Sequence, residues 1–138
     1  PLSRLRQLLL KQELAIGNLN SADRQIVLIA AALAIPADTT LTEKDVTERL
    51  YRWLTAVGSN LRDDAVELRR YLIDFRLLQR DPAGKAYTRS KSWPDHWSEI
   101  AAELASTDLA AFADQARTEE AELRAARKKA ALEKRELS

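Results

Sequence analysis

Hydrophobic residues recur at helical spacing over most of the chain, and the first two stretches predict two helices. The first stretch carries its apolar stripe at Leu2, Leu5, Leu9 and Ile16. Gly17 and Asn18 then supply a C-terminal stop. The second stretch, SADRQIVLIAAALAI, is apolar nearly all round, opens on Ser21 as a cap and ends at Pro36. A helix of that composition is buried on several sides, so we expect it at the centre of the core.

The next residues predict a short strand and two more helices. Residues 37–41, ADTTL, are too short and too rich in Thr for a helix and favour an extended strand. The Thr42 hydroxyl can cap the amide of Asp45, whose carboxylate reaches back, so a helix begins near Glu43. Its apolar face consists of Val46, Leu50, Trp53, Leu54 and Val57, and Gly58 closes it. Asp63 begins the fourth helix, with a stripe of Ala65, Leu68, Leu72 and Phe75.

At Leu77 the helical period gives way to an alternating pattern that predicts a β-hairpin. Asp81, Pro82 and Gly84 suit the first, second and fourth positions of a type I turn, and Gly84 can also form a bulge in the returning strand. LLQR and AYTR become the two arms. The order of helix, short strand, helix, helix and hairpin is that of a winged helix-turn-helix. Residues 63–76 then occupy the recognition-helix position, and the hairpin is the wing.

The end of the chain predicts two further helices. In SWPDHWSE, Pro94 suits the first helical position, and His96 between two tryptophans is better explained by aromatic packing than by ligand binding. We expect the face formed by Trp97, Ile100 and Leu104 to pack on the preceding domain. The final stretch, rich in Ala, Glu, Lys and Arg, predicts one long helix with a weak 3,4-spaced seam that includes Phe112 and Leu123. That seam can contact a second chain, giving a homodimer, or the N-terminal helix of its own chain.

These elements define a mostly α-helical protein with a winged helix-turn-helix core and a small β-hairpin wing. We expect three parts: the N-terminal helix at residues 1–20, a winged-helix-like domain at residues 21–92 and a C-terminal helical extension at residues 93–138. One core is expected, because 138 residues with 46% hydrophobic side chains suffice for one compact unit with appendages.

Composition and charge narrow the function. The chain has no cysteine, no apolar run long enough to span a bilayer and no cleavable leader, so we expect a cytoplasmic protein without membrane contact. A lone His96, three scattered glycines and no phosphate-cradling loop predict no catalytic, cofactor or metal site, and hence no enzyme. The net charge of +1 does not by itself indicate nucleic acid as a partner.

The segments LTEKDVTERL and DAVELRRYLIDFRLLQRDPAGKAYTR resemble a bacterial domain family of unknown function, over about 50 residues. The matching residues are Leu41, Thr42, Glu43, Val46, Asp64, Leu68, Arg69, Arg70, Leu72, Asp74, Leu78, Arg80, Asp81, Gly84 and Tyr87. Some members are joined to DNA-binding regulator domains, so the resemblance implies a role in transcription. Arg76 stands where members usually have Gly, which puts the conformation at the end of the helix in question.

Double-stranded DNA is therefore the first partner that we expect. Its candidate contacts from the recognition helix and the wing are Arg69, Arg70, Tyr71, Arg80, Lys85 and Arg89. Arg69 lies toward the edge of the helix and can instead pair with a carboxylate. Asp63, Asp64 and Glu67 oppose phosphate, although acids at a helix N-terminus also stabilise the helix. The alternative is a non-catalytic protein-interaction module within a larger assembly.

Overall fold

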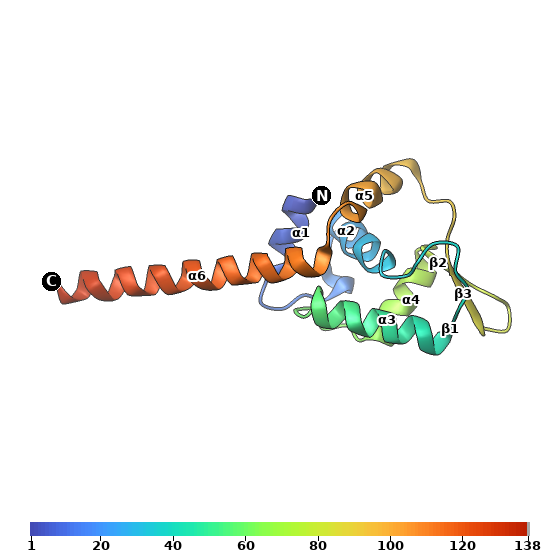
Figure 1. Cartoon of the computed structure of the whole chain (residues 1–138), viewed down its shortest axis with the longest axis horizontal. Helices are drawn as coiled ribbons and strands as arrows, with labels where there is room; N and C mark the ends of the chain where they lie inside the picture. Colours follow the sequence, from blue (N-terminus) through green and yellow to red (C-terminus); the bar gives the residue numbers. More distant parts are fainter. Residues whose placement is uncertain (138) are drawn as a thin grey trace.

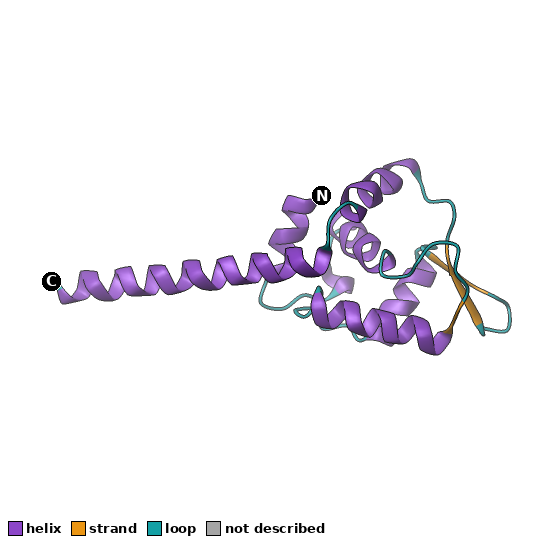
Figure 2. Ribbon diagram, viewed as in Figure 1, coloured by secondary structure: helices purple, strands orange, loops and turns teal. Residues whose placement is uncertain are grey.

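Most of the chain is helical, with one small antiparallel sheet at the end of the molecule opposite the C-terminus (Figures 1 and 2). The structure is a computed structural model that describes residues 1–137. The α-helices are α1 (Leu2–Leu9), α2 (Ser21–Ala32), α3 (Glu43–Ala56), α4 (Ala65–Asp74), α5 (Asp95–Ala105) and α6 (Leu109–Glu136). The remaining elements are the 3-10 helix η1 (Ile16–Asn18) and the strands β1 (Leu41–Thr42), β2 (Leu78–Arg80) and β3 (Ala86–Arg89).

Helix α2 forms the centre of the core, as its composition predicts. Every residue from Val27 to Ala32 is buried. Its start differs by one residue from the prediction, because the Asn20 side chain, and not Ser21, accepts the amide of Asp23 at 2.9 Å. The helix also ends at Ala32, before the predicted stop at Pro36. Ile35 remains buried in the turn that follows.

The N-terminal helix is much shorter than the sequence pattern predicts. Helix α1 ends at Leu9, and the chain then runs beside residues 60–62. The Leu14 amide donates to the Asn60 carbonyl at 3.0 Å, and the Arg62 amide donates to the Leu14 carbonyl at 2.8 Å. Ile16, the first residue of η1, is fully buried directly after this extended segment. The prediction of a helix as far as Ile16 was wrong because the backbone there hydrogen-bonds to a distant loop.

Helices α3 and α4 begin at side-chain caps. The Thr42 hydroxyl accepts the amide of Asp45 at 3.1 Å, which confirms the predicted start of α3. Helix α4 has a reciprocal capping box: the Asp64 carboxylate accepts the Glu67 amide at 2.8 Å, and the Glu67 carboxylate accepts the Asp64 amide at 3.2 Å. These bonds satisfy amides that no helical carbonyl can reach. The cap is therefore Asp64, one residue later than predicted.

The end of α4 answers the question raised by Arg76. The Arg76 amide donates to the Ile73 carbonyl at 3.0 Å, and the Leu77 amide donates to the Leu72 carbonyl at 2.9 Å. This is the Schellman arrangement, in which the residue after the cap adopts the left-handed conformation. Arg76 adopts it with φ of 60°. The exit geometry favoured by glycine is thus present with an arginine in place.

Phe75, at the C-cap of α4, was wrongly predicted to be buried. Its side chain is 36% exposed. The Phe75 ring stacks on Trp97 at 6.5 Å between centroids, and the Arg24 guanidinium lies 5.9 Å from its centre. Leu77 and Leu78 are the fully buried residues beyond the helix. They anchor the hairpin to the core in place of Phe75.

Replacing Arg76 with glycine is expected to stabilise the protein by about 0.5 to 1 kcal/mol. The gain is the relief of roughly 1 to 2 kcal/mol of left-handed strain, reduced by the larger entropy that glycine gives the unfolded chain. Urea unfolding monitored by circular dichroism measures the change. Arg76→Ala is the control, because it removes the side chain and keeps the strained Cβ. An equal shift in both variants would contradict the explanation.

The predicted hairpin is present. The Gly84 amide donates to the Asp81 carbonyl at 2.9 Å, and Gly84 has φ of 69°. β2 pairs with β3 in antiparallel register, and β1 adds to the other edge of β3, giving the order β1-β3-β2. The Asp81 carboxylate accepts the amides of Lys85 and Ala86, and these bonds lower the pKa of Asp81. Its charge therefore holds the turn in place.

Helix α5 packs on α2, as its apolar face predicts, with Trp97 and Leu104 buried. Pro94 is the N-cap and not the first helical residue. His96 is exposed and meets the edge of Trp97 at 6.1 Å between centroids. This contact agrees with aromatic packing.

Helix α6 is the predicted long C-terminal helix, and only its beginning packs on the rest of the chain. Ala113 and Ala116 are buried against α1 and α3. Residues 121–137 are exposed and extend away from the body as a single rod (Figure 1). Within residues 1–137, no helix has the length and apolarity needed to cross a membrane.

Candidate nucleic-acid interface

The six residues predicted to contact DNA divide into an exposed group and an inward-facing group. Arg70 on α4, Arg80 on β2 and Lys85 in the hairpin loop are exposed. Their side chains make no hydrogen bond or ion pair with any other residue in the range 1–137. Arg69, Tyr71 and Arg89 contact other parts of the protein. The structure therefore reduces the accessible cationic set to three side chains.

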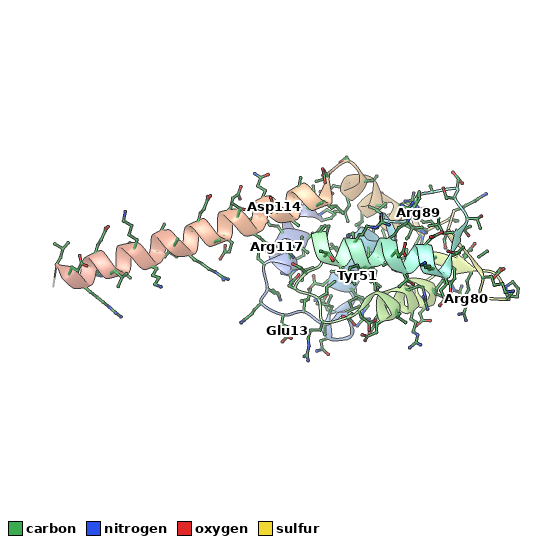
Figure 3. All side chains as sticks on the ribbon, turned by 60° about the horizontal axis from the view of Figure 1, so that its bottom comes forward. Glu13, Tyr51, Arg80, Arg89, Asp114 and Arg117 are labelled. Carbon is green, nitrogen blue, oxygen red and sulfur yellow. The ribbon has the colours of Figure 1, made fainter. Side chains whose placement is uncertain are left out.

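A cleft between α4 and the hairpin brings two of the exposed residues together. Its volume is about 320 Å³, and it is lined by Arg69, Arg70, Ile73, Asp74, Arg80 and Tyr87. Arg80 lies opposite Tyr87 across the β2–β3 pair, so both side chains share the sheet face that meets α4. Figure 3 shows Arg80 at the hairpin end of the molecule, far from the free end of α6. Three guanidinium groups and one carboxylate thus line this cleft.

Arg69 joins α4 to α3 and to the sheet. Its guanidinium donates to the Thr47 hydroxyl at 2.7 Å and pairs with Glu43 at 3.2 Å. It also lies 5.8 Å from the centre of the Tyr87 ring, and its side chain is only 14% exposed. A carboxylate partner of this kind is the alternative predicted for Arg69 from its place at the edge of the helix. Arg69 therefore positions the cleft and presents little charge to a ligand.

Arg89 faces inward and does not extend from the hairpin as predicted from the sequence. Its guanidinium donates to the Ile35 carbonyl at 3.1 Å and lies 5.8 Å from the centre of the Trp93 ring (Figure 3). The two-residue period of a strand places Arg89 on the same face as buried Tyr87. The alternation of side chains along residues 86–89 could therefore have predicted that Arg89 faces inward.

Tyr71 is also less accessible than predicted. Its side chain is half-buried, and its hydroxyl lies over Gly17, where an added Cβ would approach it to 3.1 Å. Glycine at this position therefore leaves room for the ring end of Tyr71. Tyr71 connects α4 to the N-terminal segment, on a different side from the cleft with Arg80.

The three acids at the start of α4 have structural partners. The Asp63 carboxylate accepts the Ile16 amide at 2.9 Å. Asp64 and Glu67 form the capping box described above. Their charges are held at the N-terminus of α4, where the helix dipole favours them. Among residues 1–137 no three His, Asp or Glu side chains gather as a metal site.

Comparison with known proteins gives one match. No curated protein and no solved structure matches the chain significantly. A family model described as an uncharacterized protein conserved in bacteria (DUF2087) matches residues 19–89, slightly more than half of the chain. The match extends from the start of α2 to the end of β3 and includes all six residues that line the cleft. It confirms the resemblance to a bacterial family of unknown function, and the chain belongs to the DUF2087 family.

Proposed function

We propose that this protein binds double-stranded DNA as a bacterial transcriptional regulator or accessory factor. In this proposal residues 21–92 act as a winged helix, with α4 as recognition helix and the β2–β3 hairpin as wing. The supporting observation is that Arg70 and Arg80, which come from the two elements that would contact DNA, line one cleft and make no hydrogen bond or ion pair within residues 1–137. Lys85 adds a third exposed cation at the hairpin.

The three exposed cations set the expected salt dependence of DNA binding. Three phosphate contacts by Arg70, Arg80 and Lys85 give a slope of about −2.7 for log affinity against log salt concentration. Affinity would then fall about 40-fold between roughly 50 and 200 mM salt. The acids at the start of α4 repel phosphate, and their capping bonds hold them there. DNA would therefore approach from the hairpin side of α4.

Fluorescence anisotropy with a labelled duplex of random sequence tests the proposal. The wild-type protein is expected to bind at low salt and to show the slope above. The Arg70→Ala, Arg80→Ala double variant is expected to lose about two units of slope and most of its affinity. Arg127→Ala, on the exposed part of α6, changes charge in the same direction far from the cleft and should retain binding. Absence of binding at low salt, or equal losses in both variants, would refute DNA binding.

A protein-interaction module is the second candidate, and the exposed part of α6 favours it. Leu123 and Leu132 are 46% and 49% exposed on a helix that packs on nothing in the range 121–137. A homodimer through α1 and α6 would cover such residues, although the buried start of α6 already packs on α1 of the same chain. Sedimentation at micromolar concentration, with Leu123→Glu as the comparison, tests self-association. Pull-down from nuclease-treated lysate tests for other partners.

A further inference from the structure

A second and larger cleft lies on the other side of α3. Its volume is about 490 Å³, within the range of small-molecule sites. It is an open cleft lined by α2, α3, the end of α5 and the start of α6, with β3 contributing one side chain. Its apolar walls include Ala30 of α2, the C-cap residue Leu33, Leu104 of α5 and Leu109 of α6. The cleft therefore lies where the family region meets the C-terminal helices.

The cleft contains three arginines and no carboxylate. Arg49 and Arg52 are one turn apart on α3, so their side chains are neighbours. Neither makes a hydrogen bond or ion pair with another residue in the range 1–137, and Arg49 is half-buried. Arg89, the third, is held by the Ile35 carbonyl. A partly buried cation without a counter-ion is unfavourable, so this wall is suited to an anion.

Trp53 adds an aromatic surface to the same wall. Its side chain lines the cleft, and the residue is only 7% exposed. The indole Nε1–H is itself buried and has no hydrogen-bond acceptor among residues 1–137. The ring therefore contributes an apolar surface to the cleft and no accessible donor.

We propose that this cleft binds a small amphipathic carboxylate. The carboxylate would lie between the guanidinium groups of Arg49 and Arg52, which match it in planar geometry and charge. The hydrocarbon part would lie against Ala30, Leu33 and Leu104. A polyphosphate fits less well, because most of the lining is apolar. The inference does not depend on DNA binding, since this cleft shares no lining residue with the cleft between α4 and the hairpin.

Titration with decanoate, followed by calorimetry and by tryptophan fluorescence, tests the proposal with the full chain. One saturable site per chain is expected. Acetate lacks the hydrocarbon part and decanol lacks the charge, so each is expected to bind at least about tenfold more weakly. Decyl phosphate distinguishes a carboxylate site from a general anion site. Binding of decyl phosphate more tightly than decanoate would overturn the carboxylate assignment.

Variants on α3 provide the matched comparison. Arg49→Gln and Arg52→Gln are each expected to weaken decanoate binding about tenfold or more, because each removes one charge-assisted contact. Lys44→Gln removes the same charge from the same helix but outside this cleft, and should bind as the wild type does. Thermal unfolding checks that all three variants are folded. No saturable binding at about 1 mM decanoate, or equal affinity in all variants, would overturn the proposal.

Discussion

Replacing Arg117 with alanine is expected to lower the free energy of unfolding by about 2 to 4 kcal/mol and to loosen the attachment of α6. The estimate follows from the loss of hydrogen bonds made by a charged group together with the exposure of unsatisfied acceptors. Arg117 is part of α6, and its side chain points toward the C-terminal ends of α1 and α3 (Figure 3). Its Nη2 atom donates to the Val57 carbonyl at 2.7 Å and the Asn60 side chain at 3.2 Å.

The effect is large because two helix C-termini converge on this one guanidinium. Val57 is the C-cap of α3, and Leu9, whose carbonyl lies 3.4 Å from Arg117 Nη2, is the last residue of α1. The final carbonyls of a helix lack intrahelical donors and carry the negative end of its dipole. Burial lowers the pKa of the Arg117 guanidinium, although the group stays protonated.

Arg124→Ala is the control for this prediction. Arg124 lies on the same helix, pairs with Glu120 at 3.4 Å and has a side chain that is 70% exposed. Its loss is expected to cost less than about 0.5 kcal/mol. Urea unfolding gives both values, and amide hydrogen exchange reports whether residues near Ala113 open more readily in the Arg117 variant. Similar stability losses in the two variants would show that the convergence at Arg117 has little energetic weight.

Leu72→Ala is expected to destabilise the protein by about 2 to 5 kcal/mol, the range for leucines in well-packed cores. Leu72 is fully buried, and its carbonyl also accepts the Leu77 amide at the end of α4. A cavity there would weaken the seating of α4 beneath the hairpin. Val66→Ala on the same helix is the comparison, because Val66 is 38% exposed, and its change should stay within about 0.5 kcal/mol. Thermal and urea unfolding measure both. A small loss for Leu72→Ala would mean that neighbouring side chains refill the space.

The parts of the fold that were predicted correctly depend on local chemistry. The cap at Thr42 and the turn from Asp81 to Gly84 are formed by residues within a few positions of one another. The end of α1 is different. Asn60 donates to the carbonyls of Leu8 and Lys11, so a residue about fifty positions away determines where the helix stops. The hydrophobic period of residues 2–16 gives no sign of these distant hydrogen bonds, so it could not predict where the helix ends.

The candidate sites show the same division. Arg70 and Arg80 were predicted from the helix and strand patterns, and they do line one cleft. The inward orientation of Arg89 depends on the Ile35 carbonyl, which sequence spacing does not bring near. Arg49 and Arg52 of the larger cleft were not singled out at all. Their setting exists only because α5 and α6 fold back over α2 and α3.

The segment that the family model matches, residues 19–89, contains only part of the hydrophobic core. Leu5 and Leu8 of α1, Leu104 of α5 and Ala113 of α6 lie outside residues 19–89, yet each is fully buried in the same core as α2. A fragment limited to residues 19–89 would expose the apolar side of α2 that these helices cover, and such a surface tends to aggregate. In any gene fusion that transplants residues 19–89, the host protein would have to supply replacement helices for both sides.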